Sequence, residues 1–430
     1  MIGPSLSALP AELLENIIVY NRERVYRVRN LRYTCRDVYE KTHNWFGRTF
    51  VQDIQVRMTP REFELLQGFA KNPSISRHLK GLTVSEFMKE RNGFGYLWVR
   101  DEEGKLVEPL PEAFMKNLDS MLRNGFINCT SLSVVSTSRE KQPQDSTKLH
   151  AIEAFIIILR VLIRINRNLS RVAVELYGDG SPRGYDPLDW DFFEAEESRT
   201  VLSHIQKLSI RSSLDSLPAC VLSLLRNASG VQSLSIKPRL EWPRSSQSPK
   251  IPTCDLTDKY LITPRALSLT GSFLSELELT NMVFSKSSLG GLLLHFGPNL
   301  RMLNVDEGRL LGPDGCWLPF IRSLGSHMPK LRCLSLRMLK GTLEDIEFPS
   351  LETLPWMKED WLPTQRQPRP LKPRTCIRVV SNDVTIHMIE RRFTSMVYFI
   401  GFSYHGMDIT SFLELVKETV QYVGDGNLIP

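Results

Sequence analysis

The chain has 430 residues, of which 42% are hydrophobic and 24% are charged, a balance typical of soluble globular proteins. This composition excludes a wholly disordered chain, a collagen-like chain and a multi-span membrane protein. Lysine and arginine outnumber aspartate and glutamate by 54 to 48, so the net charge is +6. That excess is too dilute to indicate nucleic acid as the main partner. The length predicts roughly two to four domains, or one elongated array.

Cysteine usage and the apolar runs bear on the compartment. The seven cysteines are scattered, with no C-x-x-C pair, so they do not form a disulfide framework and are expected to be reduced. The N-terminal stretch has no basic region and carries Glu12 and Glu15, unlike a secretory signal. The most apolar run, Phe155 to Ile165, is interrupted by Arg160 and Arg164, and we expect a buried helix there. We therefore expect a cytoplasmic or nuclear protein without a membrane segment.

The first 52 residues predict a small helical module. The first helix is expected from Leu9 to Val19, where Pro10 suits the first turn and apolar side chains recur at helical spacing. That stripe consists of Leu9, Leu13, Leu14, Ile17 and Ile18. A second stripe consists of Leu31, Cys35, Val38 and Tyr39, and a third cluster of Trp45, Phe46 and Phe50. Three amphipathic helices of this size are expected to pack on a partner or on the next domain.

Residues 53–345 carry a repeated pattern. Thr59-Pro60-Arg61-Glu62 has the N-cap, proline and glutamate of a helix start, and predicts a helix from Pro60 to Ala70. An L-x-x-L-x-L strand pattern then recurs eight times, nearly always after an amphipathic helical stretch. The eight patterns begin at Leu79, Cys129, Leu169, Ile205, Val231, Leu274, Leu300 and Leu331. We expect the preceding helices around Phe114–Leu122, Val221–Leu225, Leu289–Phe296 and Phe320–Met328.

An alternating helix and strand with a shared period is typical of a leucine-rich solenoid, in which neighbouring repeats bury one another's apolar faces. An unrelated α/β arrangement is the alternative. The asparagine or cysteine that normally follows the strand pattern is missing from all eight repeats. We therefore expect degenerate repeats and irregular curvature.

Three stretches interrupt or end this pattern. Lys237 to Thr253 holds four prolines and three serines and is predicted to be an insertion. Residues 346–375 are rich in proline and are predicted to form an extended linker. Residues 376–430 are expected to form a cap or an appended unit, with a strand from Met396 and a helix from Ile409 to Tyr422.

No local catalytic or metal-binding motif is present in the sequence. The sequence contains no H-x-x-x-H, no phosphate-binding G-x-x-x-x-G-K-[ST] and no G-x-S-x-G. The histidines at His204, His295 and His327 lie near predicted helix ends and are interpreted as structural. The acidic run Asp186 to Glu197 is interpreted as an exposed or partner-docking loop, and the basic stretch Arg22 to Arg32 as a solvated face. We expect a binding protein, not an enzyme, without cofactor or metal.

The N-terminal module resembles an F-box. The residues that carry the resemblance are LSALPAELLENII (Leu6 to Ile18), NLRYTCRDVYEKT (Asn30 to Thr42) and NWFGRTF (Asn44 to Phe50). The continuation from Phe50 to Val84 is similar to F-box proteins abundant in filamentous fungi, in which the box runs into degenerate leucine-rich repeats. The fold class expected is thus α/β, an F-box followed by an irregular leucine-rich-repeat solenoid.

The resemblance implies a substrate-recognition role in a Skp–cullin–F-box ubiquitin ligase. The box would bind the Skp-type adaptor, and through it a cullin, while the repeats hold a protein substrate of unknown identity. The adaptor-binding residues implied by the match are Leu9, Pro10, Leu13, Leu14, Ile17, Ile18, Leu31 and Cys35. The alternative is a leucine-rich interaction scaffold that works without a ligase. Neither alternative requires nucleic acid or a membrane.

Overall fold

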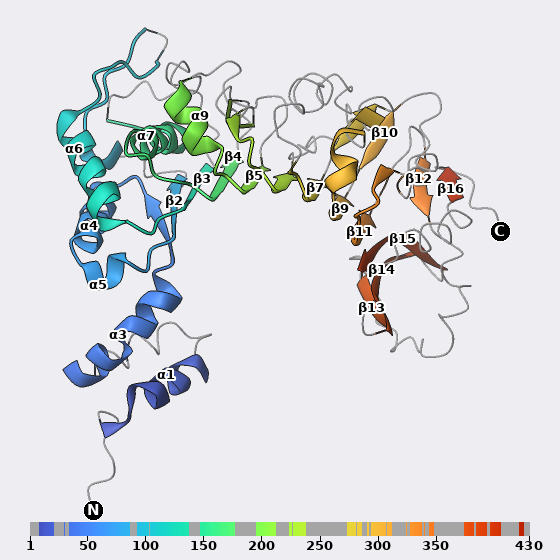
Figure 1. The fold of residues 1–430 in the computed structure, drawn as a ribbon, viewed down its shortest axis with the longest axis horizontal. Helices are drawn as coiled ribbons and strands as arrows, with labels where there is room; N and C mark the ends of the chain where they lie inside the picture. The colour runs from blue at the N-terminus through green and yellow to red at the C-terminus, as the bar shows by residue number, and fades with distance from the viewer. Residues whose placement is uncertain are drawn as a thin grey trace, which may run out of the picture. The chain divides into compact units, whose positions relative to one another are not determined.

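The structure is a computed structural model, drawn in Figure 1. The residues described are 8–20, 30, 34–86, 93–102, 104–136, 147–176, 195–211, 223–225, 227–237, 273–280, 282–285, 290–291, 294–306, 308–311, 324, 327–337, 339, 344–347, 374–381, 384–393, 396–405 and 421–424. The chain forms two compact units, Met1–Leu169 and Ser170–Pro430. Both combine parallel strands with helices, so the predicted mixed α/β class is confirmed.

The first unit begins with two helices that contact each other, α1 (Ala11–Tyr20) and α3 (Arg36–Phe50). The predicted first helix is confirmed. The apolar residues from Val38 to Phe50, predicted as parts of two stripes, lie on the single helix α3. No proline interrupts the stretch from Arg36 to Phe50, and the helix tolerates Gly47, so it continues through both stripes.

Three parallel strands follow in the first unit: β1 (Asp53–Arg57), β2 (Gly81–Glu86) and β3 (Ser131–Ser136). Between β1 and β2 lie α4 (Pro60–Ala70) and the short α5 (Pro73–Ser76). The predicted start of α4 is confirmed, because the amide of Glu62 donates to the hydroxyl of Thr59 at 3.3 Å.

The connection from β2 to β3 contains the short turn η2 (Gly93–Gly95), α6 (Glu112–Ser120) and the π-type turn η3 (Met121–Gly125). The helix α7 (Ala151–Arg164) follows β3 and packs against β2 and β3. Eleven residues of α7 are buried. This confirms the buried helix predicted from the apolar run, and it places the core of this unit between α7 and the strands.

The second unit contains six parallel strands: β4 (Arg171–Leu176), β5 (Lys207–Arg211), β6 (Ser233–Ile236), β7 (Glu276–Thr280), β9 (Met302–Asp306) and β11 (Cys333–Arg337). Neighbouring strands pair without a shift in register. With β2 and β3 of the first unit, all eight strands predicted from the L-x-x-L-x-L pattern are present. The last two leucine-type positions of each pattern point to the buried face, as the two-residue period of a strand requires.

The remaining described elements of this unit are short. They are α9 (Glu196–Leu202), β8 (Val283–Ser285), η6 (Gly297–Asn299), β10 (Arg309–Leu311), β12 (Glu344–Glu347) and β16 (Gln421–Gly424). The strands β8 and β10 pair in parallel, and β12 and β16 pair antiparallel. Of the helices predicted before β6, β9 and β11, only parts lie within the described residues.

A repeated backbone contact joins successive strands just before each begins. In each case one turn carbonyl accepts the amides of two consecutive residues that open the next strand, over 2.7 to 3.0 Å. The carbonyls are those of Gln52 and Lys80 in the first unit and of Ser170, Gln206, Gln232, Ser275 and Arg301 in the second. The turns before the strands are therefore equivalent in geometry, although their side chains differ.

The C-terminal region adds antiparallel strands to the second unit. The strands β13 (Arg374–Ser381), β14 (Val384–Phe393) and β15 (Met396–His405) form a meander, and β15 pairs antiparallel with β11. The strand predicted from Met396 is confirmed. The predicted helix from Ile409 to Tyr422 is wrong at its end, because Gln421 and Tyr422 lie in β16; residues 409–420 are outside the described residues. Most of the predicted linker, residues 348–373, is also outside them.

Candidate interaction surfaces

The N-terminal helices keep apolar side chains at their surface. Leu13 on α1 is 49% exposed, whereas its neighbour Leu14 is fully buried. Pro10 and Cys35 are exposed and Leu9 is partly exposed. The structure therefore divides the predicted adaptor-binding residues into one that supports the module and several that remain available to a partner.

The side chains of three predicted adaptor-binding residues lie outside the described part of the structure. Ile17 and Ile18 belong to α1, but their side chains lie outside the description, and Leu31 lies outside the described residues. The basic stretch from Arg22 to Arg32 falls outside them as well, apart from Asn30.

Polar contacts hold α1 against α3. The ammonium group of Lys41 donates to the carbonyl of Leu9 at 3.1 Å, and Arg48 pairs with Glu15 at 3.4 Å. Both contacts tie the start and middle of α1 to α3, and they leave the side chain of Leu13 outside the contact.

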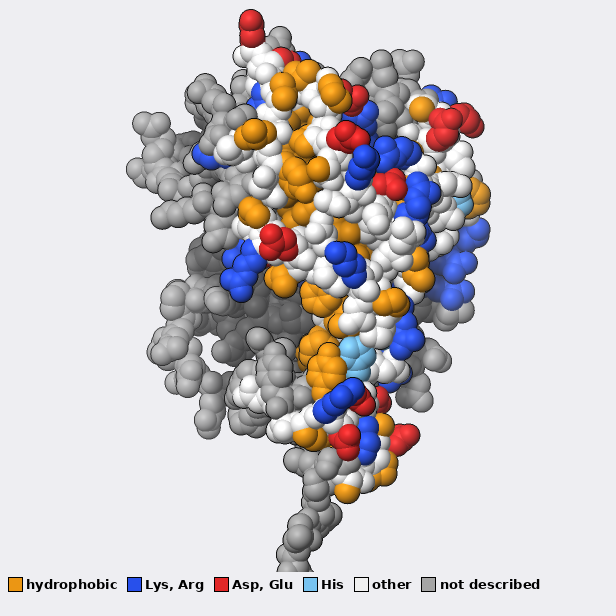
Figure 2. All heavy atoms as spheres, turned by 90° about the vertical axis from the view of Figure 1, so that its left-hand side faces the viewer, with side chains coloured by type: hydrophobic (Ala, Val, Ile, Leu, Met, Phe, Trp, Pro, Cys, Tyr) orange, Lys and Arg blue, Asp and Glu red, His pale blue; other side chains and the backbone are white. Residues whose placement is uncertain are grey.

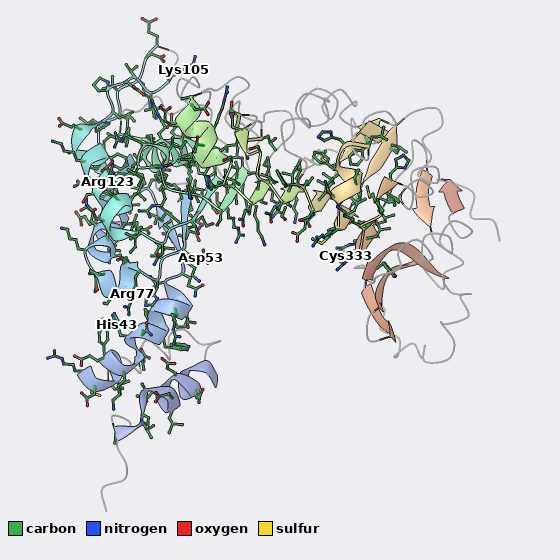
Figure 3. The ribbon with its side chains drawn as sticks, in the orientation of Figure 1. His43, Asp53, Arg77, Lys105, Arg123 and Cys333 are labelled. Carbon is green, nitrogen blue, oxygen red and sulfur yellow. The ribbon has the colours of Figure 1, made fainter. Side chains whose placement is uncertain are left out.

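The module is joined to the rest of the first unit where α3 meets α5. His43 and Ser74 share a hydrogen bond of 2.8 Å, and Arg77 donates to Asn44 at 3.4 Å. Figure 3 labels His43 on α3 and Arg77 just after α5. The helix approaches so closely that a Cβ at Gly47 would lie 2.2 Å from the His78 ring.

Basic side chains surround His78 at this junction. Burial lowers the pKa of His78, and the neighbouring charges of Arg77, Arg48 and His43 lower it further. His78 is thus kept in its neutral form, in which its ring can pack against the helix at Gly47.

Exposed apolar side chains are also found elsewhere on the first unit. Figure 2 shows orange apolar side chains along one face, with Lys and Arg gathered at its border. Among the described residues of this unit, the exposed large apolar side chains besides Leu13 and Tyr39 are Leu65, Leu97, Val99, Val107 and Ile127.

In the second unit the parallel strands present a polar face. The residues that alternate with the buried leucines and valines are mostly short or charged. One row of register partners crosses the middle of the six strands from β4 to β11. It consists of Ala173, Ser209, Ser235, Glu278, Asn304 and Ser335. Polar groups of this kind on an ordered surface can donate and accept hydrogen bonds to a protein partner.

Glu278 is the centre of a hydrogen-bond network on this face. Its carboxylate accepts from Ser235 at 2.7 Å and from Asn304 at 3.2 Å, and it pairs with Lys237 at 2.9 Å. Burial raises the pKa of Glu278, but the hydrogen bonds from Ser235, Lys237 and Asn304 and the charge of Lys237 together lower it. The network fixes these side chains across three strands, β6, β7 and β9.

A buried polar cluster in the first unit was not predicted from the sequence. Arg100 forms a two-pronged ion pair with Glu153, with N–O distances of 2.8 and 2.9 Å. It also donates to the carbonyls of Gly104 and Lys148. Arg100 lies far from Lys148 and Glu153 in the sequence, and only the fold brings them together. The cluster fixes the segment around Arg100 to the start of α7.

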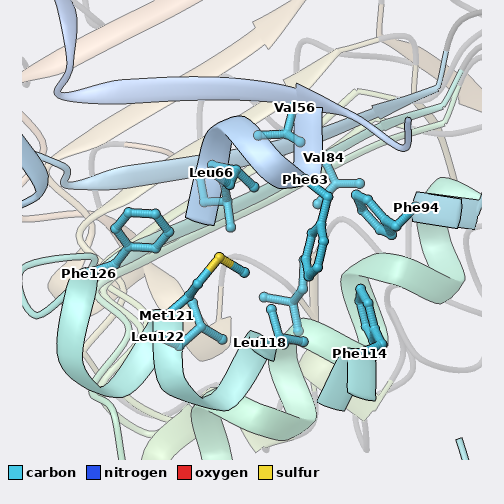
Figure 4. A pocket seen from close by; sticks show the side chains of 12 residues that line it. Val56, Phe63, Leu66, Val84, Phe94, Phe114, Leu118, Met121, Leu122 and Phe126 are labelled. Carbon is cyan, nitrogen blue, oxygen red and sulfur yellow. The ribbon is translucent and has the colours of Figure 1, made fainter. Parts of the chain in front are cut away.

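The cavity of the first unit is part of its core. Figure 4 shows the rings of Phe63, Phe94 and Phe114 around it, with centroids 5.0 to 5.4 Å apart. The void measures about 10 Å³ and its lining is apolar, so it offers roughly the space of one water molecule and no polar partner for it. It is therefore a packing defect and not a ligand site.

The described ranges hold neither a metal-ligand cluster nor a helix able to span a membrane. No group of three or more His, Cys, Asp or Glu side chains there is arranged to hold a metal ion. No helix in those ranges is both long and apolar enough to cross a membrane. His204, interpreted as structural, lies just after α9 and its ring contacts the carbonyl of Thr200 at 2.8 Å.

Comparison with known proteins adds no further assignment. No protein-family model matches the sequence, and no curated protein matches it.

Proposed function

We propose that this chain is an F-box protein, the substrate-recognition subunit of a Skp–cullin–F-box ubiquitin ligase. In this proposal the N-terminal module binds the Skp-type adaptor, and leucine-rich repeats bind a protein substrate. The observation that carries it is the side-by-side contrast of Leu13, 49% exposed, and Leu14, fully buried. A small module that keeps apolar side chains at its surface gains by burying them against a partner.

The exposed set agrees with the motif match. Leu9, Pro10, Leu13 and Cys35 are at least partly exposed, and the resemblance expects these positions to contact the adaptor. The adaptor surface that fits them is an apolar groove or helix face.

The repeated strands support the second half of the proposal. Each has one buried apolar face and one polar face, and the turns before seven of the eight share the same carbonyl contact. A leucine-rich array needs the two faces, because each repeat must bury its leucines against its neighbours while the other face binds a ligand.

The chain would make or break no covalent bond in this role. It would hold a substrate lysine close to a ubiquitin-carrying enzyme that the cullin recruits, so that the transfer proceeds at a raised effective concentration. Such complexes operate in the cytoplasm and the nucleus, and we place the protein there.

Co-purification with a recombinant Skp-type adaptor tests the proposal. The variant Pro10→Ala/Leu13→Ala removes exposed apolar groups and should leave the fold intact. We expect it to weaken adaptor binding by about tenfold or more, as truncation of central interface residues does. The matched control is Leu65→Ala on α4, which is 54% exposed in the wild type and should bind normally.

Two outcomes would contradict the proposal. One is a wild-type chain that does not retain the adaptor, and the other is a Leu65→Ala control that loses binding as much as the double variant does. A chain that holds protein partners but no adaptor would instead be the ligase-independent scaffold.

A further inference from the structure

Two cations occupy neighbouring positions at the start of the second unit's strands. Arg171 opens β4 and Lys207 opens β5, and the two are register partners. Both are exposed, and each precedes a buried residue, Val172 or Leu208, that points to the opposite face. The two side chains therefore lie on the polar face, on backbones about 4.8 Å apart.

This pair is not neutralised within the described residues, where no carboxylate forms an ion pair with Arg171 or Lys207. Further along the same face, the cation Lys237 is paired with Glu278 at 2.9 Å. Like charges on adjacent strands repel each other, which disfavours the free surface. An anion placed between the two would remove that repulsion.

The surface beside the two cations carries hydroxyl groups. Ser209 follows Lys207 on the same face of β5, and Ser233 is the register partner of Lys207 on β6. Short side chains allow a partner's backbone to approach the sheet. Serine hydroxyls and cationic side chains together form the charge-assisted hydrogen bonds that carboxylates accept.

We propose that this surface, defined by Arg171, Lys207, Ser209 and Ser233, binds an acidic segment of a partner protein. The inference rests on the proposed function and deepens it, because the acidic segment would belong to the substrate that the repeats hold.

The same strands limit the length of that segment. Glu276 and Glu278 lie on β7, the third strand beyond β4, and they would repel a longer acidic run. Three strand spacings amount to about 14 Å, which an extended peptide covers in about four residues. The surface therefore selects a short acidic stretch flanked by neutral or basic residues.

Peptide binding to the full chain tests the inference. The probes are fluorescent peptides with four glutamates, or four glutamines, between glycine–serine flanks, followed by anisotropy at several salt concentrations. We expect the glutamate peptide to bind and the glutamine peptide to bind at least tenfold more weakly. The variant Arg171→Gln/Lys207→Gln should lose this preference and most of the salt dependence.

The matched control is Lys330→Gln/Arg332→Gln, which removes two positive charges from exposed positions in the turn before β11. It should bind the glutamate peptide as the wild type does. The inference is overturned if neither peptide binds, if both bind alike, or if the two double variants lose binding equally, because net charge would then explain the result.

The chain's own acidic run is the competing occupant. The variant Asp186→Asn/Asp189→Asn/Asp191→Asn distinguishes it. Binding of the glutamate peptide that appears only in this variant would assign the surface to the acidic run and overturn the inference.

Adaptor co-purification separates this inference from the proposed function. Arg171→Gln/Lys207→Gln should still retain the adaptor. Loss of peptide binding with the adaptor retained is the expected result for that variant. A wild-type chain that retains the adaptor and ignores the peptide refutes the inference alone, and one that binds the peptide without the adaptor refutes the proposed function alone.

Discussion

The ion pair between Arg100 and Glu153 gives the sharpest test of how the first unit is stabilised. Their side chains are 6% and 0% exposed. Replacing Arg100 with Met keeps much of the side-chain volume but removes both prongs of the pair. It also removes the hydrogen bonds to the carbonyls of Gly104 and Lys148. The change therefore leaves a carboxylate and two carbonyls to find other partners.

Breaking a buried pair by removing one partner costs about 3–5 kcal/mol, because the remaining charge stays out of water. Here Glu153 keeps the hydrogen bond from the amide of His150 at 2.8 Å, so we expect about 3 kcal/mol. In Arg100→Met/Glu153→Gln the charge is gone and the amide oxygen can still accept from His150. The double variant should therefore be more stable than Arg100→Met alone.

Urea denaturation measures these differences, read on the transition that belongs to the first unit. A loss of about 3 kcal/mol should move the midpoint by about 1–2 M. Lys116→Met is the control, because Lys116 pairs with Glu112 at an exposed site and should cost under about 0.5 kcal/mol. The reasoning fails if Arg100→Met shifts the midpoint no more than Lys116→Met, or if the double variant is less stable than the single one.

Three further outcomes are expected. Thr59→Ala removes the hydroxyl that caps α4 and should lower the unfolding free energy by about 1 kcal/mol, whereas Thr59→Ser should not, as urea melts will show. Gly47→Ala should lower the unfolding free energy by about 1–3 kcal/mol, because its methyl would lie 2.2 Å from the His78 ring. A second change, His78→Ala, should restore most of that loss, and no recovery would locate the strain elsewhere. Burial raises the pKa of the Cys129 thiol to about 11. Iodoacetamide at pH 8 should therefore modify exposed Cys35 long before Cys129. Equal modification rates, measured by mass spectrometry, would contradict the burial of Cys129.

The strands could be predicted because each must bury alternate residues. Leucine-type residues therefore recur two positions apart, and all eight predicted strands carry this signal. The strand β1 was missed because only Val56 is fully buried there and Ile54 is partly exposed. The C-terminal helix was predicted too far, because Tyr422 pairs with Ile346 in β12. A tertiary partner decided that segment against its local pattern.

The candidate surfaces were only partly predictable. Periodicity placed Leu13 and Leu14 on one apolar helix face, but it could not tell which of them the neighbouring helix would cover. The cluster of Arg100 and Glu153 was missed for a different reason. Its members are 53 positions apart, and a charged residue in a loop and one in an apolar helix give no local sign of pairing.

The carbonyl contacts explain how the parallel strands keep a regular register although the residues before them differ. Before β6, for example, the carbonyl of Gln206 accepts the amides of Gln232 and Ser233. Because any residue supplies a carbonyl, the side chain at that position is free to vary, and it does from Gln206 to Ser275 to Arg301. A regular register is therefore compatible with varied side chains, and the polar face can change strand by strand.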